Sequence, residues 1–78
     1  MNKKNILNKK IAIIGLGYVG LTLGLVLAKK KFKVFGIDTN KSVIKKLKLK
    51  RPTFYEKNIS QYINKFLNKN FLVSNKLD

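Results

Sequence analysis

The sequence predicts an α/β fold: the first half of a doubly wound parallel sheet, in the order strand, helix, strand, helix, helix, strand. Two short apolar runs, residues 11–14 and 34–37, each precede a segment with helical periodicity. A glycine-rich turn follows the first run, and a single acid, Asp38, follows the second. Strands that alternate with helices are typical of βαβ units, in which the strands lie parallel.

The first strand and its helix are predicted from one uncharged stretch. Residues 11–14 read Ile-Ala-Ile-Ile, a run expected of a strand that is buried on both faces. A helix is expected at about residues 19–30, with apolar side chains on nearly every side, because it must pack close to the sheet. The lysines in its last turn suit the negative end of the helix dipole.

The second half of the order follows from caps and periodicity. Thr39 or Asn40 can cap a helix at about residues 41–49, which Pro52 prevents from continuing. Apolar residues at i, i+3, i+4, i+7 and i+8, starting from Ile59, predict a third helix, and residues 71–73 predict a third strand. Right-handed crossovers then place the strands in the order 3-2-1.

The length limits what this chain can be. The 78 residues divide into a basic lead-in, 1–10, and a partial dinucleotide-binding domain, 11–78, since a complete domain of this kind is roughly twice as long. So small a core predicts marginal stability, and an uncovered first strand predicts association through its edge. Whether the chain is an engineered piece, a gene fragment or a natural short protein, and whether it folds or binds a cofactor alone, is left open by the sequence.

The composition excludes most catalytic chemistry. The chain has no cysteine and no histidine, which removes disulfides, thiolate metal sites, cysteine nucleophiles and imidazole bases. Its three acids, Asp38, Glu56 and Asp78, are too scattered to form a carboxylate pair. We therefore expect no catalytic residue and no metal site, and a chain that is inactive alone.

One motif carries the functional prediction. A G-x-G-x-x-G pattern lies between the first strand and its helix, formed by Gly15, Leu16, Gly17, Tyr18, Val19 and Gly20. Gly15 would permit the tight turn, Gly17 would let a diphosphate approach the backbone, and Gly20 would let the helix pack closely on the strand. The amides near Tyr18 and Val19, at the positive end of the helix, would face the phosphates.

The acid after the second strand defines the cofactor. Asp38 lies 18 residues after Gly20, close to the spacing of the acid that binds an adenosine ribose in Rossmann-type domains. A carboxylate there accepts hydrogen bonds from the ribose hydroxyls and repels a 2′-phosphate. NAD is therefore favoured over NADP, a preference that Lys41 weakens slightly. The other interpretation is that Asp38 only caps the next helix and that the glycines only form a packed turn.

Three segments in order resemble the UDP-glucose/GDP-mannose dehydrogenase family. They are residues 10–21, with Tyr-Val inside the glycine motif, residues 34–40, and residues 52–56, Pro-Thr-Phe-Tyr-Glu. The last is similar to the family's Phe-Tyr-Glu-Pro-Gly-Leu connection. The resemblance implies that the glycine motif, from Gly15 to Gly20, holds the pyrophosphate of NAD and that Asp38 holds the adenosine ribose.

The resemblance also implies a reaction. Members oxidise the C6 alcohol of a nucleotide sugar to a carboxylate in two hydride transfers, with catalytic residues that lie beyond this chain. It implies a nucleotide-sugar substrate, a role in polysaccharide biosynthesis, a cytoplasmic homo-oligomer when full length, and neither nucleic acid nor membrane as a partner. Which sugar nucleotide is used is not encoded in these residues.

Two departures from the family's pattern concern the adenosine end and the second connection. Val43 stands where the family often has a basic residue, for which Lys41 is a possible substitute, and Lys57-Asn58 replaces Pro-Gly. Glu56 is interpreted as a helix-start acid, with a role in substrate or domain contacts as the alternative. Three aromatic residues are interpreted as packing residues: Phe54, Tyr55 and Tyr62.

Two alternatives come from other classes of protein. Residues 11–28 carry no charge and are flanked by lysines, as in a membrane or secretory segment, although four glycines interrupt them. The net charge of +15 also allows a nucleic-acid-binding module. Against that module, only one of the 18 basic residues is an arginine, the residue best suited to bidentate phosphate and base contacts.

Overall fold

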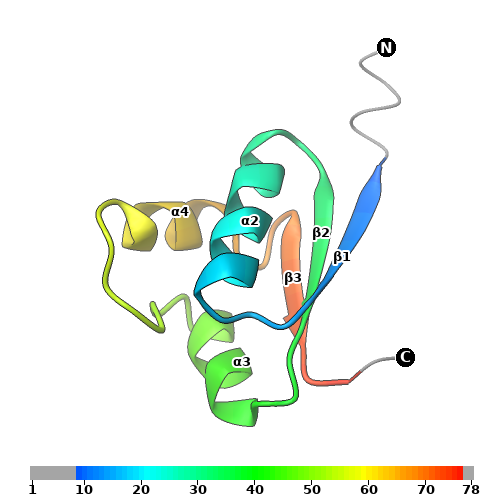
Figure 1. Ribbon diagram of the computed structural model, residues 1–78. Coiled ribbons are helices and arrows are strands. Elements are labelled where there is room, and N and C mark those ends of the chain that lie inside the picture. Colours follow the sequence, from blue (N-terminus) through cyan, green and yellow to red (C-terminus); the bar gives the residue numbers. More distant parts are fainter. Residues whose placement is uncertain (1–8, 77–78) are drawn as a thin grey trace.

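The computed structural model describes residues 9–76 and contains the six elements in the predicted order (Figure 1). Each begins and ends within two residues of its predicted bounds. The lead-in predicted at residues 1–10 falls largely outside the described residues, and the first strand already begins at Lys10. The elements are β1 (Lys10–Ile14), α2 (Tyr18–Lys29), β2 (Lys33–Ile37), α3 (Lys41–Lys48), α4 (Ile59–Phe66) and β3 (Phe71–Ser74).

The three strands form one parallel sheet in the order β1-β2-β3. Val34 of β2 lies opposite Ile11 on one side and opposite Phe71 on the other. This is the predicted order, with β2 in the centre. Since the carboxyl ends of parallel strands lie at one edge, the turn after β1 and the residues after β2 are neighbours, and that edge is where ligands bind in such folds.

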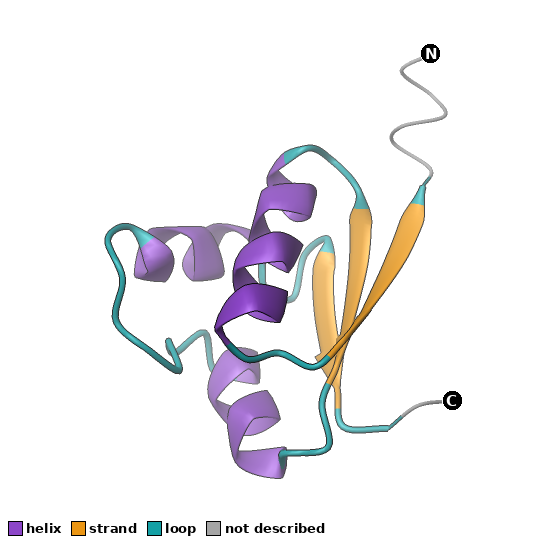
Figure 2. Cartoon of the chain, in the orientation of Figure 1, coloured by secondary structure: helices purple, strands orange, loops and turns teal. Residues whose placement is uncertain are grey.

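All three helices cover the same face of the sheet, and the other face is open (Figure 2). Ile13, Val34 and Phe71 point to the helices and are buried, whereas Ile14 is 67% exposed and Leu72 is 43% exposed on the opposite face. The prediction that residues 11–14 are buried on both faces is therefore wrong for the described residues. Both crossovers pass over one side of the sheet, so only alternate strand residues are covered.

Glycines allow α2 to lie close to the strands beneath it. A Cβ atom added to Gly24, in the middle of α2, would lie 2.5 Å from the ring of Phe71 in β3. One added to Gly36 of β2 would lie 2.7 Å from the side chain of Leu16. The Phe71 ring and the Leu16 side chain fill the spaces that the two glycines leave, and both are fully buried.

The ends of the helices use short polar side chains. Asn40 caps α3, its Oδ1 accepting the backbone N–H groups of Ser42 at 2.9 Å and Val43 at 3.3 Å. The side-chain amide of Asn70 donates to the carbonyl oxygens of Ala28 at 2.8 Å and Phe32 at 3.1 Å. The first contact fixes the start of α3 after Asp38, and the second ties the end of α2 to the approach to β3.

The uncharged run at residues 11–28 is not one helix. It divides into β1, a turn at Gly15–Gly17 and the first eleven residues of α2. Within residues 9–76, no helix has the length and apolar character needed to cross a bilayer. The membrane-span interpretation of this run is therefore wrong.

Candidate functional site

The turn between β1 and α2 is tight and is held by the neighbouring strand. Gly15 has a φ of +93°, a value that side chains make costly. Its N–H donates to the carbonyl oxygen of Ile37, the last residue of β2, at 2.7 Å. The turn therefore lies directly beside the end of β2, as the sequence predicted.

Glycine stands at positions 17 and 20 of the motif for different physical reasons. A Cβ at Gly20 would collide with the carbonyl oxygen of Gly15 and would lie 3.4 Å from Ile13, so close packing of α2 on the turn requires glycine there. A Cβ at Gly17 would meet no protein atom within 4 Å, and its φ of −71° is open to any residue. The positive φ of Gly15 and the close packing at Gly20 thus explain those two glycines, whereas neither reason applies to Gly17, whose missing side chain leaves the backbone open to a ligand.

The start of α2 offers donors for an anion. Gly17 is the N-cap residue and supplies no side-chain hydrogen bond, and no acid occupies the first turn. The N–H groups of Tyr18, Val19 and Gly20 have no acceptor within the helix, because the first turn of any α-helix lacks one. Together with the positive end of the helix dipole, these amides can bind a phosphate.

The Leu16 amide has a different role from the amides at the start of α2. Its side chain is buried, at 1% exposure, and packs against Gly36. Its backbone N–H donates to the Oδ2 atom of Asp38 at 2.8 Å. The Leu16 amide therefore fixes the acid rather than standing free for a phosphate.

Asp38 lies at the end of β2 with both carboxylate oxygens in use. Oδ2 accepts from Leu16, and Oδ1 accepts the N–H of Asn40 at 2.9 Å. These two hydrogen bonds, the one from Leu16 first, hold the pKa of Asp38 below its ordinary value. The carboxylate therefore joins the glycine turn to the start of α3, and its remaining lone pairs can accept from ribose hydroxyls.

This lowered pKa predicts a pH dependence of stability. A group whose pKa is lower in the folded chain stabilises the fold above its unfolded pKa, about 3.9 for Asp, and this contribution is lost as pH falls through the folded value. We expect the free energy of unfolding to fall between about pH 5 and pH 2 more steeply in the wild type than in Asp38→Asn. Urea unfolding across this range measures the difference; parallel curves would contradict it.

A model of the UDP-glucose/GDP-mannose dehydrogenase family, NAD binding domain, matches residues 9–78. The chain belongs to this family. UDP-N-acetyl-D-mannosamine dehydrogenase of Methanocaldococcus jannaschii is 44% identical to it over 46 residues, which are 59% of this chain and 11% of that protein. The cofactor of the matched domain is NAD, so the glycine turn belongs to the NAD-binding part of an oxidoreductase family.

Solved structures agree with this assignment. UDP-D-ManNAc dehydrogenase from Pyrococcus horikoshii superposes with a TM-score of 0.82 at 29% identity, covering 86% of this chain and 16% of that one. UDP-glucose dehydrogenase from Pyrobaculum islandicum has a TM-score of 0.85 at 23% identity, covering 97% of this chain and 18% of that one, and shows the shared fold. The chain spans less than a fifth of each relative's length.

One contact of the family motif was not predicted from the sequence. The hydroxyl of Tyr18, the first residue of α2, donates to Oε1 of Glu56 at 2.9 Å, across 38 residues of chain. The Tyr18 and Phe54 rings lie 5.1 Å apart. The hydrogen bond to Glu56, then the charge of that carboxylate, raises the pKa of Tyr18. Two of the three segments that resemble the family thus meet at the start of α2.

Two sequence-based interpretations of this connection are wrong. The Glu56 side chain reaches Tyr18 and does not cap α4, whose N-cap residue, Asn58, also makes no side-chain cap. Tyr55 is 98% exposed and is not a packing residue, whereas Phe54 and Tyr62 pack against the core as expected. Tyr55 lies between Phe54, which packs against the core, and Glu56, whose side chain reaches Tyr18 at the surface.

Position 43, where the family often has a basic residue, carries no charge in this chain. Val43 is half-buried and packs against the core, so it does not replace the basic residue that is frequent there. Lys41, at the start of α3, is exposed.

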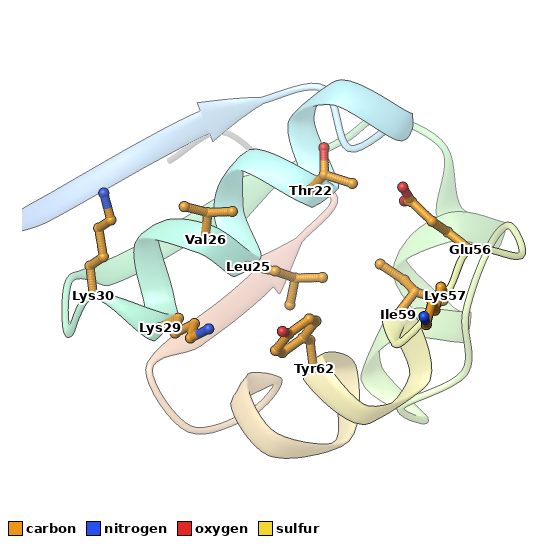
Figure 3. Close-up of a pocket in the computed structure, with 9 residues that line it drawn as sticks. All are labelled: Thr22, Leu25, Val26, Lys29, Lys30, Glu56, Lys57, Ile59 and Tyr62. Atoms are coloured by element: carbon orange, nitrogen blue, oxygen red, sulfur yellow. The ribbon is translucent and has the colours of Figure 1, made fainter.

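A groove of about 510 Å³ lies between α2 and α4 (Figure 3). Thr22 and Glu56 lie at one end, and Lys29 and Lys30 at the other. Its floor contains Leu25, which is buried in the core, and the Lys29 Nζ atom lies 5.5 Å from the centre of the Tyr62 ring. The groove is therefore the seam along which α4 packs on α2, with Glu56 at the end nearest the glycine turn.

Proposed function

We propose that this chain holds the ADP half of NAD at the glycine turn, as part of a nucleotide-sugar dehydrogenase. The observation that carries this proposal is the glycine at position 17. Protein packing does not require a glycine there, and the residue lies at the start of α2, next to the Leu16 amide that binds the Asp38 carboxylate. The backbone from Gly15 to Gly20 would bind the diphosphate, and Asp38 would bind the adenosine ribose. Bound NAD would supply the hydride acceptor; this chain contributes binding and orientation.

The complete reaction is proposed from the family. We propose oxidation of the C6 alcohol of a nucleotide sugar, UDP-glucose or a related UDP-sugar, to the carboxylate, as a step toward a surface polysaccharide. The named relatives act on UDP-N-acetyl-D-mannosamine and UDP-glucose, which supports a UDP-sugar. The catalytic groups would come from outside these 78 residues, since the chain has neither cysteine nor histidine. We further propose a cytoplasmic, homo-oligomeric enzyme.

The ribose role of Asp38 is testable by cofactor preference. We expect Asp38→Ala to weaken NAD binding roughly tenfold, because hydrogen bonds between a charged group and the ribose are lost. NADP binding should stay level or tighten, because the repulsion of its 2′-phosphate disappears. Titrations followed by NMR measure both affinities.

The change in net charge alone would strengthen NAD binding in Asp38→Ala, opposite to the expected loss. Removing a carboxylate from a chain of net charge +15 strengthens its attraction for any anion, so a loss of NAD affinity has a specific cause. Gln61→Lys, at an exposed position of α4, adds the same unit of positive charge and is the control for charge alone. Equal shifts of NAD and NADP affinity in Asp38→Ala would remove the ribose role.

A further inference from the structure

Carboxylates are scarce in this chain, and those in the described residues act on one place. Only three of 78 residues are acidic, against 18 basic ones, and Asp78 lies outside the described residues. The other two both bind the segment that starts α2: Asp38 through the Leu16 amide and Glu56 through the Tyr18 hydroxyl. The proposed function assigns Asp38 to the adenosine ribose, whereas it assigns no role to Glu56.

The connection between α3 and α4 is attached to the fold at alternate residues. Phe54 packs against the core and against the Tyr18 ring, at 5.1 Å between ring centres and 49° between ring planes. The next residue, Tyr55, is 98% exposed. Glu56 turns back in: its side chain accepts from Tyr18, and its carbonyl oxygen accepts the Ile59 N–H that begins α4, at 3.1 Å.

The backbone and the side chain of Tyr18 therefore have separate roles. Its backbone N–H is one of the amides at the start of α2, and its side chain is held from outside the helix by Phe54 and Glu56. The hydroxyl hydrogen is donated to Glu56 in a hydrogen bond at the surface, where Tyr18 is 56% exposed. The same hydrogen bond holds the Glu56 carboxylate near the amides at the start of α2, which are proposed to bind the diphosphate.

We propose that Tyr18 and Glu56 are positioning residues that hold the connection at residues 51–58 against the first turn of α2, so that the connection and the nucleotide-binding turn move as one unit. We name Tyr18, Phe54 and Glu56 the anchor. Its effect on NAD rests on the proposed function, whereas its effect on the connection does not. The anchor acts through a hydrogen bond and a ring contact, not through the negative charge of Glu56.

Four variants separate these contributions. Tyr18→Phe keeps the ring on Phe54 and removes the hydroxyl, and Glu56→Ala removes the acceptor. Glu56→Gln removes the charge but keeps an Oε1 that accepts from the hydroxyl. Tyr55→Phe is the matched control, because it removes the hydroxyl of an adjacent tyrosine that is 98% exposed.

Amide hydrogen exchange of Arg51 and Ile59, at the two ends of the connection, is the primary measurement in the full 78-residue chain, because their N–H groups donate to the carbonyl oxygens of Lys46 and Glu56. Tyr18→Phe and Glu56→Ala should each speed exchange about three- to tenfold, the range expected for one lost hydrogen bond. The double variant should exchange no faster than either single one, because both remove the same interaction. Glu56→Gln and Tyr55→Phe should stay within about twofold of wild type.

Two further measurements distinguish positioning from general destabilisation. In Glu56→Gln the pKa of Tyr18, followed by NMR of its ring, should fall toward its ordinary value while exchange remains slow. NAD affinity should fall about two- to fivefold in Tyr18→Phe and Glu56→Ala and stay level or rise in Glu56→Gln, which removes only a repulsive charge.

Each contrary result contradicts one part of the proposal. Wild-type exchange of the Arg51 and Ile59 amides in Tyr18→Phe and Glu56→Ala would overturn the anchor. Wild-type exchange with weakened NAD binding in Tyr18→Phe would instead assign the hydroxyl to the nucleotide. If wild type binds no NAD, the proposed function fails, and the exchange and titration measurements still decide whether the anchor exists.

Discussion

Replacing Gly20 with alanine is expected to unfold most of the chain. A Cβ at this position would occupy the place of the Gly15 carbonyl oxygen, which belongs to backbone held at a φ of +93° and tied to β2. Backbone cannot move aside as a flexible side chain can, so we expect a loss of about 3 kcal/mol or more. A single domain of this size has only a few kcal/mol of net stability.

The sign of this effect is opposite to helix propensity. Within a helix, alanine is favoured over glycine by about 1 kcal/mol, so propensity alone predicts that Gly20→Ala stabilises α2. Gly17→Ala is the matched control, since the same methyl group there meets no protein atom within 4 Å. We expect Gly17→Ala to change the free energy of unfolding by less than about 1 kcal/mol. A wild-type urea midpoint for Gly20→Ala would show that α2 does not press on the turn.

The elements and their order were predictable because their signals are local. A four-residue apolar run, a glycine turn, an Asn cap and an i, i+3, i+4 stripe each depend on residues that are close in sequence. Parallel order then follows from the handedness of crossovers. The same reasoning placed Gly15 and Asp38 at one edge of the sheet, where the N–H of Gly15 meets Ile37 beside Asp38.

Contacts over long distances in the sequence were not predictable in this way. Nothing local to Tyr18 indicates a partner 38 residues away, although the Phe-Tyr-Glu segment signalled that Glu56 was special. The prediction for Tyr55 failed for a related reason. Aromatic character alone cannot say which of two neighbouring rings, Phe54 or Tyr55, turns toward the core, because the connection has no regular period there.

The open face of the sheet shows another limit of local reasoning. Strands rich in Ile and Val predict burial on both sides in a parallel sheet, yet Ile14, Phe35 and Leu72 lie 37–67% exposed. Their apolar character is consistent with the full doubly wound architecture, in which helices lie on both faces. The composition thus reflects the architecture of the family's domain, whereas the observed exposure reflects the elements that residues 9–76 form.

Serine at position 17 is expected to weaken NAD binding at least about tenfold while leaving stability unchanged or slightly higher. Gly17 is the N-cap residue of α2, a position where serine serves as well as glycine or better by a few tenths of a kcal/mol. Its Cβ has free space in the protein, so folding has no reason to resist it. The same side chain would stand where a diphosphate must approach the backbone.

The serine hydroxyl adds a second effect on the ligand. As an N-cap it would accept from the amides of the first turn of α2, the donors that a phosphate needs. Adenosine is the control ligand, because it carries the base and ribose without the diphosphate; its affinity should be the same in Gly17→Ser and wild type. Titration of both ligands, with urea unfolding of both proteins, measures the contrast. Equal NAD affinity in a stable Gly17→Ser variant would mean that no phosphate rests on this turn, and that glycine at position 17 needs another explanation.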